Sequence, residues 1–246
     1  MSRPGSPRPV ARGTTDPEGR LLTRRTAIVT TVASLATATS AALVSGAPSA
    51  ALAATPAYPG VREHGNLLGR ASAPVRIVLF ADLKCPACRS FEQTELGTVV
   101  RRLVRPGRAA IELHLVDIID GNVGTHDGAR LRTTALNLAS RNRLWRFARE
   151  VLRRQGDETR EWATPARLVE LGRLAGAPVG AGTMRETAAS RRAARADDQR
   201  FSRLEATGTP ALYVRRRDGG STLAVSNTSA RGIEEAVARL ERGGTR

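Results

Sequence analysis

Residues 75–91 read VRIVLFADLKCPACRSF, and this stretch decides the fold. Residues 75–81 form an almost unbroken apolar run, which is typical of a β-strand buried on both faces. Three residues separate the run from the motif CPAC, whose proline suits the first turn of a helix. The helical spacing of apolar residues then continues to residue 104. The stretch therefore predicts a buried strand that leads directly into a helix, with Cys85 at the helix N-terminus.

Cys85 and Cys88 are the only cysteines in the chain. A disulfide between them would close a very short loop, and such a loop adds little stability. At a helix N-terminus, unpaired backbone N–H groups and the helix dipole stabilise a thiolate and lower its pKa. We therefore interpret Cys85 as a nucleophile and Cys88, one turn later, as the thiol that resolves a mixed disulfide.

Two other interpretations of the cysteine pair remain open. One is a purely structural disulfide, although its loop is short. The other is a zinc site, which needs four ligands. The histidines that would complete it stand at spacings that match no common zinc site, and they are His64, His114 and His126. We expect no metal and no cofactor apart from the redox-active disulfide Cys85–Cys88.

The rest of the chain predicts an α/β fold with many helices in its second half. Strands are expected at residues 110–116, 211–214 and 221–226, the last two joined as a hairpin across Asp218-Gly219. Helices are expected at residues 129–139, 143–154 and 231–240. A further helix begins at Thr164-Pro165 and closes at Gly176, and another follows the capping-box pattern Thr183-Met184-Arg185-Glu186.

The N-terminus has the composition of an export signal. Six arginines lie in residues 1–25, and no charged residue lies between Thr26 and Val61. A mildly apolar run at residues 27–44 is followed by Ala51-Leu52-Ala53, which suits a signal peptidase. Thr23-Arg24-Arg25 resembles a twin-arginine signal. An uncleaved membrane anchor is the alternative, and in both cases the remainder lies outside the cytoplasm.

These patterns divide the chain into four parts. We expect a signal peptide or anchor at residues 1–53, a linker at 54–63, one domain at 64–242 and a short tail at 243–246.

Composition excludes several classes of protein. A hydrophobic content of 41% excludes a wholly disordered chain, and two cysteines exclude a disulfide-stapled miniprotein. The formal net charge is +16, but Lys84 is the only lysine and the arginines are scattered along the chain. Aromatic residues make up only 3%, whereas nucleic-acid-binding proteins concentrate their charge and interleave it with aromatics. We therefore expect no nucleic-acid partner.

Residues 68–88 resemble the opening of the DsbA-type thioredoxin-fold oxidoreductases. The matching features are a Pro-Val entry at residues 74–75, the apolar strand, Asp82 three residues before the motif, and Cys-Pro-x-Cys. Trp145 and Phe147 fall where the helical insertion of that family carries aromatics. Thr209-Pro210 matches the family's loop that ends in a cis-proline. The resemblance extends over about residues 64–242.

The resemblance implies a thioredoxin-like fold with a helical insertion, at about residues 124–206, between its βαβ and ββα halves. It implies that Cys85 is the nucleophile and Cys88 the resolving thiol. The expected supporting residues are Pro86, Ala87, Lys84 and Asp82. A substrate peptide would add to the backbone edge formed by Gly208, Thr209 and Pro210. The cis or trans state of Pro210 stays open, and an ordinary turn is the alternative.

The sequence departs from the family in three places that bear on the chemistry. Ala87 brings no imidazole to the thiolate, so the reduction potential is open between about −270 mV and about −120 mV. Leu79 stands where thioredoxins place a buried acid, so Asp82 either assists deprotonation of Cys88 or caps the helix. Lys84 either lowers the pKa of Cys85 or is simply solvated.

Taken together, the residues and the resemblance predict an exported thiol–disulfide oxidoreductase that mainly oxidises dithiols. The expected partners are cysteine-containing exported proteins, and the family implies a membrane quinone-linked protein that reoxidises the pair. We expect a monomer. A reductase, for example in cytochrome c maturation, and a non-catalytic cell-envelope peptide-binding module are the alternatives. A disulfide isomerase is less expected, because no dimerisation domain precedes the thioredoxin-like part.

Overall fold

The structure is a computed structural model that describes residues 57–243. The predicted signal peptide or anchor at residues 1–53 lies outside the described residues, as do residues 54–56 and 244–246. Among the described helices, none has the length and apolar character needed to cross a membrane.

The described residues form one six-stranded sheet with the order β1-β2-β4-β3-β5-β6. Its strands are β1 (Glu63–His64), β2 (Leu67–Leu68), β3 (Val75–Ala81), β4 (Ala109–Leu115), β5 (Ala211–Arg216) and β6 (Leu223–Ala224). β3 and β4 are parallel, and every other neighbouring pair is antiparallel. All seven residues of β3 are buried, as its apolar run predicts.

Both faces of β3 are covered because its side chains alternate between two clusters of core residues. Ile77 and Leu79 belong to the larger cluster, which includes residues of the long helix after the CPAC motif. Val78 and Phe80 belong to the smaller cluster, against which Phe201 packs from the opposite face. The Phe80 and Phe201 rings meet edge to face, with their centroids 5.3 Å apart.

The helical part before β4 is one continuous helix from Pro86 to Val104 that includes two π-helical turns. It consists of α1 (Pro86–Phe91), η1 (Glu92–Leu96), α2 (Gly97–Val99) and η2 (Val100–Val104). α9 (Ala230–Gly243) closes the described chain and contacts α2, β3 and β5.

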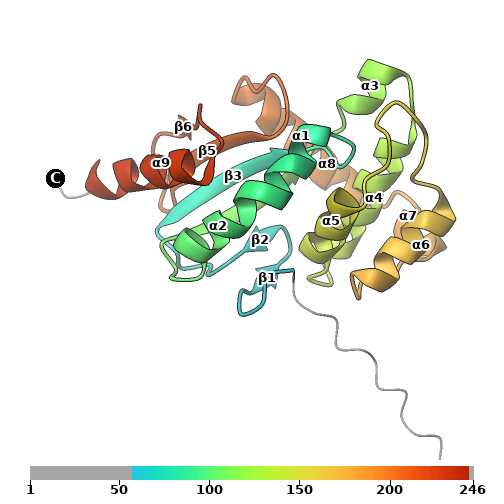
Figure 1. Ribbon diagram of the computed structural model, residues 1–246, viewed down its shortest axis with the longest axis horizontal. Helices are drawn as coiled ribbons and strands as arrows, with labels where there is room; N and C mark the ends of the chain where they lie inside the picture. Colours follow the sequence, from blue (N-terminus) through green and yellow to red (C-terminus); the bar gives the residue numbers. More distant parts are fainter. Residues whose placement is uncertain (1–56, 244–246) are drawn as a thin grey trace, which may run out of the picture. The chain divides into compact units, whose positions relative to one another are not determined.

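Six helices lie between β4 and β5. They are α3 (Ile119–Val123), α4 (Asp127–Ala139), α5 (Leu144–Arg153), α6 (Pro165–Leu174), α7 (Ala181–Met184) and α8 (Ala188–Arg203). Figure 1 shows α3 to α7 gathered beside the end of the sheet at which β3 leads into α1. The predicted α/β fold with a helical insertion is confirmed, and the insertion begins at Ile119, before the expected start near residue 124.

The predicted start of α8 is wrong. The capping box does not use Thr183 and Glu186, because a box is formed instead by Thr187 and Ser190. Thr187 Oγ1 accepts from the backbone N–H of Ser190 at 3.1 Å, and Ser190 Oγ accepts from that of Thr187 at 2.9 Å. A serine at the third helical position therefore replaces the glutamate that the pattern requires.

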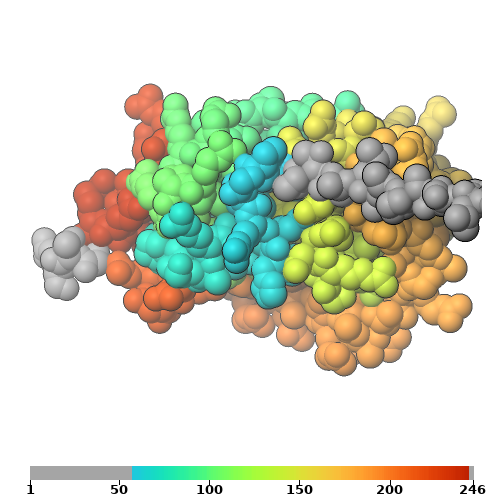
Figure 2. All heavy atoms as spheres, turned by 90° about the horizontal axis from the view of Figure 1, so that it is seen from below, coloured from blue at the N-terminus to red at the C-terminus, as the bar shows by residue number. Residues whose placement is uncertain are grey.

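The predicted linker also ends earlier than expected. Ala57, Tyr58 and Val61 are buried in the core, so residues 57–61 are packed against the domain. In Figure 2 this segment, in blue, lies between the green chain near residues 100–110 and the yellow-green part of the insertion. Arg105 Nη2 donates to the carbonyl of Pro59 at 3.0 Å, which fixes one side of the segment.

His114, one of the histidines considered for zinc, instead ties α8 to β4. Asp197 of α8 places one carboxylate oxygen 2.6 Å from His114 Nδ1 and accepts the N–H of Leu115 with the other at 2.9 Å. On the other side of the ring, the Arg200 guanidinium lies 3.1 Å from His114 Nε2. His114 is therefore part of a buried polar network that holds α8 against the sheet.

Candidate active site

Cys85 is the N-cap residue of α1, and Pro86 is the first helical residue. Its backbone is still extended, with φ −73° and ψ 121°, so the chain changes from strand-like to helical conformation at this residue. The Cys85 carbonyl accepts the N–H of Arg89 at 3.1 Å as the first hydrogen bond of the helix. Pro86 and Ala87 are exposed, whereas Cys85 and Cys88 are buried free thiols.

The surroundings of Cys85 lower its pKa to about 6. The largest cause is the hydrogen bond with the Cys88 thiol, and burial opposes it. The Thr209 side chain and the backbone N–H groups of Cys88 and Ala87 lower the pKa further. A thiolate is therefore favoured at neutral pH without an imidazole at residue 87, because the helix N-terminus and the second thiol supply the stabilisation.

Cys88 has the opposite character. Burial raises its pKa well above the ordinary value of a thiol, and the neighbouring Cys85 raises it further. Cys88 therefore keeps its proton while Cys85 is ionised. A pair in which one thiol ionises readily and the other does not is suited to disulfide exchange.

The Thr209–Pro210 peptide bond is cis, which excludes the ordinary turn considered from the sequence. The carbonyl oxygen of Thr209 lies 3.3 Å from Cys85 Sγ, although the two residues are 124 positions apart. Thr209 and Pro210 are partly buried, and Gly208 is exposed. These residues line an open groove of about 380 Å³ formed by residues 205–213, 224–226 and 228. Of the predicted substrate-binding residues, Thr209 thus lies directly against Cys85.

Lys84 lies in a buried ion cluster. Its side chain is completely buried, so the expectation of a solvated lysine is wrong. Its Nζ lies 3.0 Å from Asp120 Oδ1 and 2.6 Å from Asp127 Oδ1, and it also donates to the hydroxyl of Thr125. Two carboxylates thus surround its charge, and the main causes of the lowered Cys85 pKa do not include Lys84.

Asp82 does not cap α1, so this alternative is wrong. Its Oδ1 accepts the N–H of Lys84 at 2.7 Å, and its Oδ2 accepts those of Ile118 and Ile119 at 2.7 and 2.9 Å. These last two residues begin α3. The carboxylate therefore joins the loop after β3 to the start of the helical insertion.

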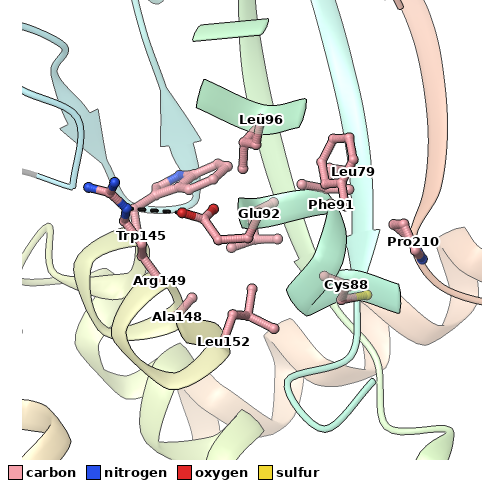
Figure 3. A pocket seen from close by; sticks show the side chains of 12 residues that line it. Leu79, Cys88, Phe91, Glu92, Leu96, Trp145, Ala148, Arg149, Leu152 and Pro210 are labelled. Carbon is pink, nitrogen blue, oxygen red and sulfur yellow. Dashed lines mark hydrogen bonds and ion pairs between the residues drawn. The ribbon is translucent and has the colours of Figure 1, made fainter. Parts of the chain in front are cut away.

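Glu92 is a buried carboxylate near Cys88 that the sequence analysis did not identify. Both residues line an enclosed cavity of about 20 Å³, together with Leu79 and Pro210. Figure 3 shows the Glu92 carboxylate pointing toward Arg149 and away from Cys88. The cavity is large enough for one water molecule. Glu92 stands four residues after Cys88 in a predicted helix, and this spacing places both on one helix face.

The Glu92 carboxylate is fully partnered by residues from two other segments. Burial raises its pKa, and hydrogen bonds from Tyr58 and Arg149 oppose that shift. Its Oε2 accepts from the Tyr58 hydroxyl at 2.8 Å, and its Oε1 accepts from Arg149 Nε at 2.9 Å. The Arg149 guanidinium also lies over the Tyr58 ring, 4.7 Å from the centroid. Glu92 therefore joins the segment that begins at residue 57 to the helix that carries Cys88.

Replacing Lys84 by methionine should lower the free energy of unfolding by about 3–5 kcal/mol, because Asp120 and Asp127 would then be buried without their cation. Urea unfolding of the two proteins measures the difference. The control is Arg231→Met, which breaks an exposed ion pair with Glu235 and should change stability by less than about 1 kcal/mol. Equal small effects of both substitutions would show that the Lys84 cluster contributes nothing to stability.

Comparisons with known proteins agree with this architecture. Residues 62–225 match a family model described as "Thioredoxin". The probable disulfide bond formation protein D of Bacillus anthracis is 26% identical over 154 residues, covering 60% of this chain and 68% of that protein.

Solved structures share the fold at low sequence identity. The crystal structure of oxidised BdbD from Bacillus subtilis aligns with a TM-score of 0.56 at 20% identity, over 74% of this chain and 99% of that one. Wolbachia pipientis α-DsbA1 aligns with a TM-score of 0.58 at 12% identity, over 72% and 91% of the two chains.

Proposed function

This chain belongs to the thioredoxin family, in its DsbA-type branch, and is a thiol–disulfide oxidoreductase; from that premise we propose that it is exported and works mainly as a dithiol oxidase. The observation that carries the proposal is the contrast between the two thiols. The pKa of Cys85 is lowered to about 6, and that of Cys88 is raised well above its ordinary value. A reduced form that contains a stabilised thiolate favours oxidation of a substrate by the disulfide form.

In the first half of the reaction, a substrate thiolate attacks Cys85 Sγ in the Cys85–Cys88 disulfide. A bond forms between the substrate sulfur and Cys85, and the bond between the two cysteines breaks. Cys88 leaves and takes up a proton, because its buried site disfavours the thiolate. The product is a mixed disulfide between the substrate and Cys85.

In the second half, another thiolate of the substrate attacks the substrate sulfur of the mixed disulfide. The substrate disulfide forms, and Cys85 leaves as a thiolate. A thiol of lower pKa leaves faster, so the surroundings of Cys85 favour this step. The substrate loses two electrons, and the CPAC pair gains them as two reduced cysteines. We assign the redox chemistry to this pair alone, with no metal or other cofactor.

We assign substrate binding to the groove beside the cis peptide bond. The backbone at Thr209 lies beside Cys85 Sγ, so an extended peptide laid along this loop would bring its own cysteine against Cys85. Pro86 and Ala87, which follow Cys85, are exposed, so a peptide in the groove could also contact the CPAC motif. The substrates are then cysteine-containing exported proteins in extended conformations.

The proposed location and partners rest on the sequence. Export follows from the composition of residues 1–53, and the described domain then functions outside the cytoplasm. An oxidase needs a protein that accepts its two electrons, and the family resemblance implies a membrane quinone-linked partner. We propose that the enzyme acts as a monomer.

The reduction potential of the Cys85–Cys88 pair tests the direction of the reaction. The full chain is equilibrated with glutathione buffers of known potential, and the free thiols are counted by the mass added on alkylation. We expect a value above about −180 mV, which is typical of an oxidant. A value below about −250 mV would contradict the oxidase proposal and would favour a reductase that needs a dedicated electron donor.

A further inference from the structure

The loop that precedes Cys85 is held by a side chain from the helical insertion. Gln155, which follows α5 by two residues, is 7% exposed. Its Nε2 donates to the carbonyl of Leu83 at 2.8 Å and to the carbonyl of Cys85 at 3.2 Å. One amide group thus joins two carbonyls on either side of Lys84, in a loop about 70 residues away in the sequence.

The same loop is held a second time through Lys84. The acceptors of its ammonium group come from α3, from the loop after it and from the first residue of α4. The second oxygen of Asp127 accepts the N–H groups of Trp162 and Ala163, both at 2.7 Å. Asp127, which binds Lys84, is therefore itself held by the segment that leads into α6. The loop that contains Lys84 then has little freedom to shift.

The position of this loop matters for the thiolate of Cys85. The Cys88 thiol is the largest cause of the lowered Cys85 pKa, and the N–H groups of Cys88 and Ala87, in the first turn after the N-cap residue Cys85, lower it further. The carbonyl of Cys85 accepts two hydrogen bonds, one from Arg89 within the helix and one from Gln155 outside it. Gln155 thus holds the N-cap residue of α1 from outside the helix.

Gln155 does not act on the thiolate by charge, because its side chain is neutral. Its influence on Cys85 must therefore come from the two hydrogen bonds that hold the backbone of the loop.

We propose that Gln155 is a positioning residue for thiol–disulfide exchange, because its amide holds the Cys85 carbonyl and so keeps Cys85 at the N-terminus of α1, with its Sγ 3.3 Å from the Thr209 carbonyl oxygen. The inference rests on the proposed function in one respect, which is that Cys85 is the reacting thiol. It gives the helical insertion a direct role in the reactivity of the CPAC pair.

The test is the pH dependence of Cys85 alkylation in the reduced full chain, with Gln155→Leu as the variant. Leucine removes both hydrogen bonds and nearly preserves the volume. Iodoacetamide reacts with the thiolate, and peptide mass analysis identifies the modified cysteine. We expect the pH at which Cys85 alkylation reaches half its maximal rate, the alkylation midpoint, to move upward by about one pH unit. This shift lowers the thiolate fraction at pH 6 about fivefold. The control is Gln199→Leu, at an exposed position of α8, which should keep the midpoint of the unaltered protein.

A purely structural role for Gln155 gives a different result. In that case Gln155→Leu lowers the melting temperature and leaves the alkylation midpoint unchanged, and this outcome would overturn the inference. If the circular dichroism of Gln155→Leu shows an unfolded chain, the same measurement is made on Gln155→Ala. The smaller side chain lets water hydrogen-bond to both carbonyls, so they are not left unpaired. Water does not tie the loop to the helical insertion, so the same upward shift of the midpoint is expected.

The readout also separates this inference from the proposed function. Alkylation needs no protein substrate, so it reports on Cys85 whether or not the oxidase proposal holds. If Cys85 of the unaltered protein reacts like an ordinary thiol, the assignment of Cys85 as the activated nucleophile fails. If Cys85 of the unaltered protein is activated but Gln155→Leu has the same alkylation midpoint, only the positioning role of Gln155 fails.

Discussion

Replacing Cys85 by serine should reduce catalysed dithiol oxidation to the rate of the uncatalysed control. A serine hydroxyl cannot form the disulfide that accepts the two electrons, and no other cysteine in the chain can replace it. The measurement is the recovery of activity by a reduced, unfolded substrate protein that needs disulfides to fold. Circular dichroism of the variant verifies that its fold is retained.

Cys88→Ser provides the matched control, because it also removes the disulfide but keeps the reactive thiol. With an oxidised substrate it should accumulate a stable mixed disulfide through Cys85, since the thiol that resolves this species is missing. Cys85→Ser should accumulate none, because the buried Cys88 keeps its proton. Full oxidase activity in Cys85→Ser would refute the enzyme mechanism. Unaltered function in a Cys85→Ser/Cys88→Ser double variant would favour a peptide-binding module.

The reduced protein should become more stable as the pH rises from about 6 to about 9, by up to about 4 kcal/mol relative to Cys85→Ser. The pKa of Cys85 is about 6 in the folded protein, against an ordinary value of 9.0. Between these values the unfolded chain binds a proton that the folded chain does not bind, so stability increases with pH. The contribution is fully present above the unfolded pKa and is lost as the pH falls through about 6.

Urea unfolding of both reduced proteins at pH 5, 7 and 9 measures this difference. Cys85→Ser lacks the titrating thiol, so subtracting its stability removes the contribution of every other group that titrates equally in both proteins. The oxidised protein has no thiolate at Cys85, so its stability should not show this increase. Parallel stability curves for the two proteins would contradict a thiolate stabilised by folding.

Local patterns were sufficient to predict the elements that carry the cysteines. The apolar run of β3 and the proline after Cys85 depend on neighbouring residues, so they predict a buried strand, a helix start and an N-cap cysteine. Helical periodicity likewise predicted most helices of the insertion. The capping-box prediction at Thr183 was wrong because Thr187 and Ser190 satisfy the same backbone groups, and the pattern alone does not distinguish competing caps.

The family resemblance supplied what local patterns could not, namely the pairing of the CPAC motif with Thr209-Pro210. The structure adds the cis peptide bond and the contact between Thr209 and Cys85. It also excludes a solvated Lys84, whose two carboxylate partners lie in the helical insertion.

By itself the sequence determined the strand and helix at the cysteines, the position of Cys85 at a helix N-terminus and the thiol chemistry that follows. These properties arise from contacts between residues a few positions apart, which periodicity and capping reveal. Only the tertiary structure decided the burial of Lys84, the partners of Glu92 and the hydrogen bonds from Gln155 to the Cys85 loop. Each of these depends on residues at least 34 positions apart, and chain folding rather than spacing brings them together.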